Sequence, residues 1–343
     1  MSQKVAILIP TMNRVSFLER QLKYYHDSKS IHPIYIGDAS SQENAKENQK
    51  IIKRFQPYLS IKYYYWHNKT DRETLYDLAC QVEEKYTVFI ADDDFLIPQS
   101  LTNCAHFLSE NREYRSAQGR GVLFTLKDIG AYGKLSCCGD YWKKPQAEEN
   151  SAMARIRRFS LNYWVPQFSV KRSDDFLEDL TNYRDITDKG FGELINSFQI
   201  IANGKSKFLD CLYLVRQGHQ ERYLIQDLNT RRKLKTYQES LVVFLDTITK
   251  AICKQDALQY DDVFPQVKAF YHDVYLKNSK KSIWKKLSSR LRRFISRVFV
   301  TKNMRKFIQM QRAKKGLLNH YALNDKAHKF FGDYQGILNS LKK

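Results

Sequence analysis

The first 110 residues alternate between short apolar runs and amphipathic segments. An unbroken apolar run predicts a strand that is buried on both faces, as in parallel sheets, and apolar residues at every third or fourth position predict a helix. Strands are predicted at residues 5–9, 34–36, 61–66 and 87–91, with helices at residues 17–25, up to residue 55, 72–84 and 98–108. Strands that alternate with helices predict a doubly wound α/β sheet.

The helix after the first strand opens with a capping-box pattern, in which Glu19 follows Ser16 by three residues. Beyond residue 120 the pattern is less regular. A helix is predicted at residues 192–202, where Gly204 ends it. Strands are predicted at residues 121–125, 163–170 and 207–216.

Beyond residue 220 strand signals fade, and helical patterns continue with breaks near Pro265 and Gly316. A chain of 343 residues is long enough for two domains. We expect an α/β domain at residues 1–222 and a helical, basic C-terminal region at residues 223–343. Residues 277–315 contain fifteen Lys or Arg and no Asp or Glu, so most of the net charge of +20 lies there.

Residues 283–299 place apolar side chains, Trp284 and Phe294 among them, on one helical face and basic side chains around the others. Such a helix can lie in an anionic membrane surface, which we expect as a partner. The alternative is that the apolar face packs on the α/β domain. Nucleic acid is not an expected partner, because the aromatic residues share the apolar face and are not interleaved with the basic ones.

The location of the protein is predicted from three further features of the sequence. No stretch approaches the roughly 18 consecutive apolar residues that a membrane-spanning helix needs. The six cysteines form no CxxC pair, and the chain opens without a signal-peptide pattern. We therefore expect reduced thiols and a cytoplasmic protein, peripheral on the inner face of the cell membrane.

Polar residues follow several of the predicted strands where each strand ends. Because ligands of such sheets bind beyond the carboxyl ends of the strands, Thr11, Asp38 and the run Asp92-Asp93-Asp94 are expected on one rim. Consecutive carboxylates repel one another, and a divalent cation removes that repulsion. Mg²⁺ and Mn²⁺ prefer one or two carboxylates together with substrate phosphates, so the run predicts a metal–diphosphate site. The alternative is a solvated loop with a helix-capping acid.

Three motifs resemble the family 2 glycosyltransferases in order and spacing: residues 5–13 (VAILIPTMN), 36–41 (IGDASS) and 88–98 (VFIADDDFLIP). Together they cover most of residues 1–110. The resemblance implies a GT-A fold, which is a Rossmann-like, doubly wound mixed sheet. It also implies a UDP-sugar donor, a Mn²⁺ or Mg²⁺ ion and inversion at the anomeric carbon.

The resemblance also assigns roles in donor binding. Pro10 and Thr11 match the nucleotide contacts of the first loop, Asp38 matches an acid that binds uracil, and Arg72 matches a nucleotide-facing arginine. The aspartate run matches the metal-binding motif, with Asp92 on the donor side. Alignment on Pro98 makes Asp93 the metal ligand, whereas alignment on the first aspartate makes it Asp94, and both alternatives stay open.

Further along, residues 192–194 precede a helix, Gly204, a strand and Arg216, in an order that resembles the family's base-containing segment. This places Glu193 at the position of the general base. The family commonly has two adjacent acids there, whereas this chain has only Glu193, so Asp185 and Asp188 remain alternatives. His219 follows Arg216 by three residues, where related enzymes carry a histidine that completes the metal site or contacts the diphosphate.

An acceptor site is predicted in the middle region, where basic and aromatic side chains could bind phosphate and stack on sugars; the alternative is a solvated helix face. These residues are Arg155, Arg157, Arg158, Tyr163 and Trp164.

The residues and this resemblance together imply a metal-dependent, inverting glycosyltransferase of the hexosyltransferase type. It would move a hexose or N-acetylhexosamine from a UDP-sugar to a glycan or lipid-linked acceptor in surface polysaccharide biosynthesis. A sugar-phosphate nucleotidyltransferase is the first alternative, but the loop formed by residues 10–14 lacks the glycine that a triphosphate-binding loop needs. A basic nucleic-acid-binding protein is the second. The sugar, the acceptor, the linkage and the oligomeric state do not follow from the sequence.

Overall fold

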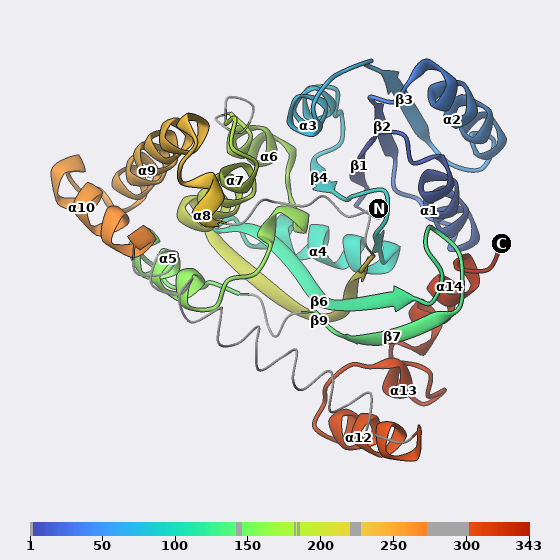
Figure 1. Ribbon diagram of the computed structural model, residues 1–343. Coiled ribbons are helices and arrows are strands. Elements are labelled where there is room, and N and C mark those ends of the chain that lie inside the picture. The colour runs from blue at the N-terminus through green and yellow to red at the C-terminus, as the bar shows by residue number, and fades with distance from the viewer. Residues whose placement is uncertain (1–2, 142–145, 182, 184–185, 220–227, 273–301) are drawn as a thin grey trace.

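Figure 1 shows the computed structural model, which describes residues 3–141, 146–181, 183, 186–219, 228–272 and 302–343. The strands are β1 (Val5–Thr11), β2 (Ile34–Asp38), β3 (Ile61–Tyr65), β4 (Tyr86–Phe89), β5 (Phe95–Leu96), β6 (Tyr114–Leu126), β7 (Leu135–Asp140), β8 (Val170–Arg172) and β9 (Lys205–Gln217). Within the described residues these nine strands form one sheet, in the order β3-β2-β1-β4-β8-β6-β9-β5, and β7 pairs with β6 beside that path.

Helices cover the sheet and follow its strands. In the first half they are α1 (Val15–Asp27), α2 (Gln42–Phe55), α3 (Asp71–Cys80), α4 (Pro98–Glu110) and α5 (Ala152–Leu161). The middle contributes a 3-10 turn η1 (Pro166–Phe168), α6 (Ser173–Asp179) and α7 (Lys189–Asn203). The last part contains α8 (Leu228–Arg231), α9 (Lys235–Asp256), α10 (Tyr260–Tyr271), α12 (Lys302–Lys314), α13 (His320–Leu323) and α14 (Phe331–Ser340).

The sheet is mixed. Strands β3, β2, β1 and β4 are parallel, and Thr11 lies opposite Asp38 where β1 and β2 end. Strand β8 runs antiparallel to both β4 and β6, while β6 and β9 form a long parallel pair. The carboxyl ends of β1, β2 and β4 therefore meet at one edge, as the sequence predicts.

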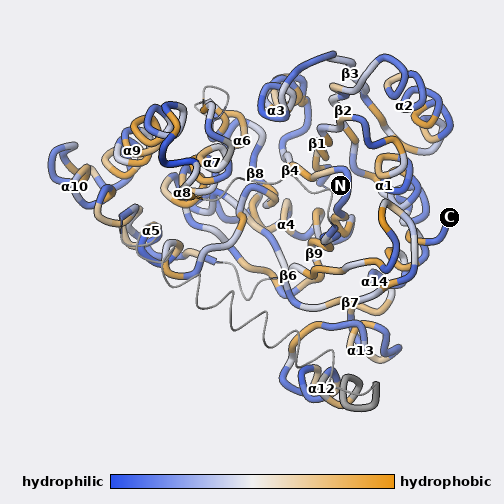
Figure 2. Tube along the Cα trace, in the orientation of Figure 1, coloured by the Kyte–Doolittle hydropathy of each residue, from blue (hydrophilic) through white to orange (hydrophobic). Residues whose placement is uncertain are grey.

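Both faces of the sheet are covered, and successive residues of β1 pack in different cores. Val5, Ile7 and Ile9 are buried with residues of α1, α4 and α14, whereas Ala6 and Leu8 are buried with residues of α3, α7 and α9. Figure 2 shows hydrophobic residues along β1 and β9 and mixed colours along the surrounding helices. This arrangement explains the unbroken apolar run of β1, and the predicted doubly wound α/β fold is confirmed.

The predicted capping box at the start of α1 is wrong. The N-cap of α1 is Arg14, without a side-chain cap, and Ser16 lies inside the first turn. A capping box instead begins α3, where Thr70 accepts from the backbone of Glu73 and the Glu73 side chain accepts from the backbone of Thr70. The same pattern, Ser or Thr followed by Glu three residues later, thus occurs at the N-cap of α3 and inside the first turn of α1, so the pattern alone does not locate a helix start.

The middle region departs most from the predictions. The strand expected at residues 163–170 is replaced by η1 and the short β8, because Pro166 lacks the N–H that a ladder needs and starts a 3-10 turn instead. Strand β7 was not predicted. Gly204 does follow α7, with an extended backbone, and a side chain there would meet the Arg115 Cβ at 2.8 Å. A close approach of two chain segments, and not a left-handed turn, requires this glycine.

The described residues after 227 pack against the α/β part in several places. Helix α9 packs on α7 and shares its core, and α14 packs on α1. Pro265 lies inside α10, so the predicted break there is wrong, whereas Gly316 follows α12 with a φ of 72°. The division at residue 222 stays a prediction, and the predicted amphipathic helix at residues 283–299 lies outside the described residues.

Two further observations concern the described part of the chain. None of the six cysteines, all of which lie in it, forms a disulfide. No helix among the described residues combines the length and the apolarity that crossing a membrane requires.

Candidate active site

The aspartate run lies at the carboxyl edge of the sheet, in the turn between β4 and β5. Asp92, Asp93 and Asp94 are 3%, 6% and 1% exposed. Helix α4, which follows, has Ile97 as its N-cap and no side-chain cap. A solvated loop with a helix-capping acid is therefore wrong, and the burial of three adjacent carboxylates calls for compensating positive charge.

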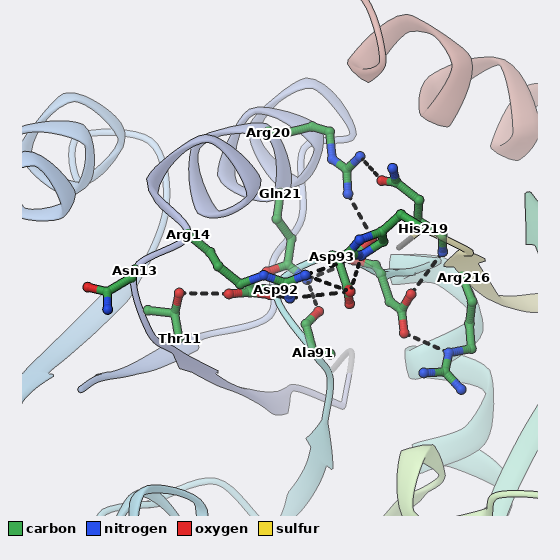
Figure 3. Close-up of polar contacts among 12 residues, drawn as sticks. Thr11, Asn13, Arg14, Arg20, Gln21, Ala91, Asp92, Asp93, Arg216 and His219 are labelled. Carbon is green, nitrogen blue, oxygen red and sulfur yellow. Dashed lines mark hydrogen bonds and ion pairs between the residues drawn. The ribbon is translucent and has the colours of Figure 1, made fainter. Parts of the chain in front are cut away.

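Each of the three carboxylates has a different set of partners (Figure 3). Asp92 accepts from the Thr11 hydroxyl at 2.8 Å and from Arg14 at 2.6 Å. Asp93 Oδ2 lies 2.8 Å from His219 Nε2 and 3.3 Å from both terminal nitrogens of Arg14. The predicted residues Thr11, Asp92, Asp93 and His219 are thus brought together, around an arginine that the sequence did not single out.

Asp94 has partners outside this group. Its carboxylate accepts from Arg216 Nε at 2.7 Å and from the backbone N–H of Gln217 at 2.9 Å. The Arg216 guanidinium contacts two aromatic rings, at 5.0 Å from the centroid of Tyr141 and 4.8 Å from that of Phe168. Asp94 therefore anchors the end of β9 to the turn after β4.

Helix α1 supports the backbone of the aspartate turn. The buried Arg20 donates to the Asp93 carbonyl at 2.7 Å and to the Ala131 carbonyl at 2.6 Å. Gln21 donates to the carbonyls of Ala91 and Asp94 at 3.0 and 2.8 Å. Neither role was predicted from the sequence, although a Gln and an Arg beside the apolar positions of a helix can indicate buried polar contacts.

Burial and charge act in opposite directions on these carboxylates. Burial raises the pKa of Asp92 and of Asp94 to about 6, against the opposing charges of Arg14 and Arg216. Burial would also raise the pKa of Asp93, but the bond with His219 and the charge of Arg14 hold it below its usual value. Asp93 is therefore the member of the run that most strongly keeps its negative charge.

Asp38 ties together the loops after β1 and β2. It is fully buried, and its carboxylate accepts from the Ser40 backbone at 2.9 Å and from Asn48 and Tyr63 at 2.8 Å each. The Asn13 backbone in turn donates to the Ser40 hydroxyl at 2.7 Å. Contact with a nucleobase would use the remaining acceptor position of Asp38, and this role stays a prediction.

Glu193 in α7 and Arg72 in α3 lie apart from the aspartate run in sequence, and Gly192 links their surroundings. The half-buried Glu193 accepts from the Tyr163 hydroxyl at 2.6 Å. A side chain at Gly192, one residue earlier, would meet the Arg72 guanidinium at 3.2 Å. Arg72 at the start of α3 therefore lies beside the first turns of α7, and the roles assigned to both residues stay predictions.

The two alternatives for the base have different outcomes. Asp188 is the N-cap of α7, accepts from the backbone of Gly190 and Phe191, and forms an ion pair with Arg231. These contacts give Asp188 a structural role at the helix start. Asp185 lies outside the described residues.

The predicted acceptor residues are dispersed. Arg155 is buried and donates to the carbonyls of Ile201 and Ala202 at 2.9 and 2.7 Å, which caps the end of α7. Its predicted role in acceptor binding is therefore wrong. Arg157 and Arg158 lie on the exposed face of α5, in agreement with the solvated-face alternative, and Trp164 is buried against Phe159.

Comparisons with known proteins place this geometry in a known fold. No protein-family model matches the chain, and no curated protein sequence does. Among solved structures, S. aureus TarS 1–349 matches with a TM-score of 0.50 and 14% identity, over 88% of this chain and 77% of the TarS chain. The same TarS fragment in complex with UDP matches with a TM-score of 0.50 and 15% identity, over 80% of this chain and 74% of that one. At such identities the likeness establishes the fold, and this chain has the Rossmann-like, mixed-sheet GT-A fold that its sequence predicts.

Proposed function

We propose that this chain is a glycosyltransferase that uses a UDP-sugar as donor. The observation that supports this most strongly is the buried aspartate run at the carboxyl edge of the sheet, with Asp93 beside His219 and arginines on both sides. Open α/β sheets bind their ligands at this edge. TarS, which has a similar fold, has been solved in complex with UDP.

A divalent ion, Mn²⁺ or Mg²⁺, belongs to the proposal, and the side chains at the turn fit it in part. Among the described residues no three His, Cys, Asp or Glu side chains converge as metal ligands. Asp93 and His219, however, bring a carboxylate oxygen and an imidazole nitrogen within 2.8 Å. Such ions need only one or two protein ligands when a diphosphate supplies others. The bound ion would stabilise the charge that develops on the leaving diphosphate.

The contacts favour one of the two alignments that remain open for the metal ligand. Both oxygens of Asp94 are held by Arg216 and Gln217, whereas Asp93 Oδ2 faces His219. We therefore propose Asp93 and His219 as the pair that would hold the ion. Asp94 would instead fix Arg216 beside the diphosphate.

For the acceptor side we propose Glu193 as general base. It would take the proton of the acceptor hydroxyl as that oxygen attacks the anomeric carbon and the bond to UDP breaks. A single displacement of this kind inverts the anomeric centre. Tyr163, which donates to Glu193 Oε1, would orient the carboxylate.

The acceptor class and location are proposed from charge. Residues 277–315 concentrate fifteen basic residues, which suits an enzyme at an anionic membrane surface. We propose a surface-glycan or lipid-linked acceptor, a hexose or N-acetylhexosamine as the transferred sugar, and action at the cytoplasmic face of the membrane in polysaccharide biosynthesis.

Calorimetric titration of the full chain with UDP, GDP and CMP, each with Mn²⁺ and with a chelator, tests the donor. UDP should bind with Mn²⁺ and bind weakly with the chelator, because the diphosphate and the aspartates are both negative. UDP-glucose and UDP-N-acetylglucosamine should then be hydrolysed slowly in the absence of an acceptor. Binding of none of these nucleotides would reject the proposal, and pyrophosphate release from UTP and a sugar phosphate would favour the nucleotidyltransferase.

A further inference from the structure

Arg14 occupies the position where cation ligands converge. Its guanidinium lies 2.6 Å from Asp92 Oδ1, 3.3 Å from Asp93 Oδ2 and 3.2 Å from His219 Nε2, and it stacks 4.6 Å from the ring centroid of Phe17. Carboxylate oxygens and an imidazole nitrogen are the donor types that Mn²⁺ binds in proteins. A guanidinium therefore sits among the side chains that would bind a divalent ion.

The hydrogen bonds of His219 also point to a shared cation. Nε2 lies 2.8 Å from Asp93 Oδ2 and 3.2 Å from an Arg14 nitrogen. If Nε2 carries a proton it can bond Asp93 but it repels Arg14, and if it carries a lone pair it can accept from Arg14 but faces the lone pairs of Asp93. When Nε2 carries the lone pair, a positive charge between Nε2 and Oδ2 removes the repulsion between the lone pairs of the two atoms. Nδ1 of His219 has no hydrogen-bond partner among the described residues, so only the contacts of Nε2 bear on which ring nitrogen carries the proton.

The charges of the site are balanced without any metal ion. Three buried carboxylates face three arginines: Arg14 and Arg216 bind their oxygens, and Arg20 binds the turn's backbone. A divalent ion added to this neutral cluster would leave a large excess of positive charge in a poorly solvated place. A diphosphate that arrives with the ion would offset that excess.

We propose that Arg14 is the resident counter-ion of the cation site, and that a divalent ion replaces its guanidinium beside Asp93 and His219 only when a diphosphate binds and accepts Arg14. This inference rests on the proposed function. The side chain of Arg14 is 24% exposed, whereas those of Asp92 and Asp93 are 4% and 8% exposed, so the arginine can leave while the carboxylates stay. Arg14 is a positioning residue that couples the ion to the donor.

Manganese binding, followed by the electron paramagnetic resonance signal of the free ion, tests the proposal on the full chain without catalysis. Wild type is compared with Arg14→Gln and Arg14→Met, which remove the charge, and with Arg14→Lys, which keeps it. Methionine retains an apolar contact with Phe17. Arg54→Gln is the matched control, because Arg54 forms an ion pair with Glu19 of α1 at an exposed position. Each variant is melted with and without Mn²⁺ to verify that it folds.

Without UDP, Mn²⁺ should bind the two neutral variants about tenfold or more tighter than wild type, Arg14→Lys or Arg54→Gln. With UDP present, wild type should gain affinity for Mn²⁺, and the difference in Mn²⁺ affinity between wild type and the neutral variants should become smaller. Equal Mn²⁺ affinity of wild type and a folded neutral variant without UDP would overturn the proposal. So would wild type binding Mn²⁺ equally well with and without UDP. Failure of UDP to bind any variant would instead reject the proposed donor, and the comparison without UDP would still decide the role of Arg14.

Discussion

At the scale of single residues, Asp93 and Asp94 are neighbours in sequence with different environments. Asp93→Asn should lower sugar transfer by roughly 100-fold or more, a larger effect than its loss of stability explains, because an amide is a poor ligand for a hard cation. Asp94→Asn should mainly lower the free energy of unfolding, by about 1–3 kcal/mol, because it leaves the half-buried Arg216 without its carboxylate.

Transfer assays and melting curves of both variants check this pair, with Asp27→Asn as an exposed control on α1. A greater loss of transfer in Asp94→Asn than in Asp93→Asn, at equal stability, would reverse the proposed register.

Glu193→Gln should lower turnover by roughly 10²–10⁴ while UDP binding persists, as loss of a general base does. Tyr163→Phe should reduce turnover less, because it removes only the hydrogen bond that orients Glu193. Single-turnover rates and calorimetric UDP affinities of the two variants separate chemistry from binding. Normal turnover of Glu193→Gln would move the search to Asp185.

Lys171 is fully buried, lies 3.7 Å from Asp179, and its Nζ has no hydrogen-bond partner among the described residues. Burial lowers its pKa from 10.5 to about 8. Between these two values the unfolded chain binds more protons than the folded one, so this group makes stability rise with pH. Below pH 8 the buried charge therefore destabilises the fold.

Lys171→Met should accordingly raise the free energy of unfolding by about 2 kcal/mol at pH 7, and the gain should vanish towards pH 10.5. Asp179 keeps its bond to Arg115 at 2.7 Å in the variant. Urea denaturation of both proteins across this pH range isolates Lys171, since other titrations cancel in the difference. A destabilised variant at pH 7 would show that the ion pair outweighs the burial of the charge.

Thr11, Asp92 and Asp93 were predicted as site residues because strand ends are readable along the chain, and His219 was predicted from the family resemblance. Arg14 could not be assigned in the same way. Its role depends on where a long side chain points after β1, β4 and β9 have come together. Arg14 is 78 positions from Asp92 and 205 positions from His219 in the sequence. Contacts over such separations are set by tertiary packing, which no local pattern encodes.

At the scale of elements, α1 and α3 offer a matched test of helix capping. Thr70→Ala should lower the free energy of unfolding by about 1 kcal/mol, because it removes the side-chain cap of α3. Ser16→Ala, in a similar sequence pattern but inside the first turn of α1, should change it by less than about 0.5 kcal/mol. Urea denaturation of the two variants makes the comparison. An equal loss in both would mean that Ser16 also caps its helix.

Elements with unbroken apolar runs were predicted well, and short polar ones were not. Strands β1, β2 and β4 were found because burial on both faces leaves a strong signal. Strand β7 contains two adjacent cysteines between a serine and a glycine, and most of its positions are at least partly exposed. Its hydrophobic pattern is therefore weak. Strand β8 has only three residues and exists because it fits between β4 and β6.

At the scale of the whole molecule, the basic charge predicts a membrane contact. The protein should co-sediment with anionic vesicles but not with neutral ones, and salt should weaken the binding because charges are screened beyond about 8 Å at 0.15 M. Replacing Trp284, Leu291 and Phe294 by Ser should reduce vesicle binding and leave UDP binding intact. If the triple variant unfolds or loses UDP, these residues belong to a core.

The contact between α14 and α1 joins segments about three hundred residues apart, and Tyr24 and Tyr334 are buried there. During synthesis α1 emerges from the ribosome long before its partner exists. Its aromatic face must stay exposed to water, or be held by a chaperone, while the rest of the chain is made. A nascent chain that stalls before α14 would therefore carry the aspartate turn on an incompletely covered helix, open to proteases and to aggregation.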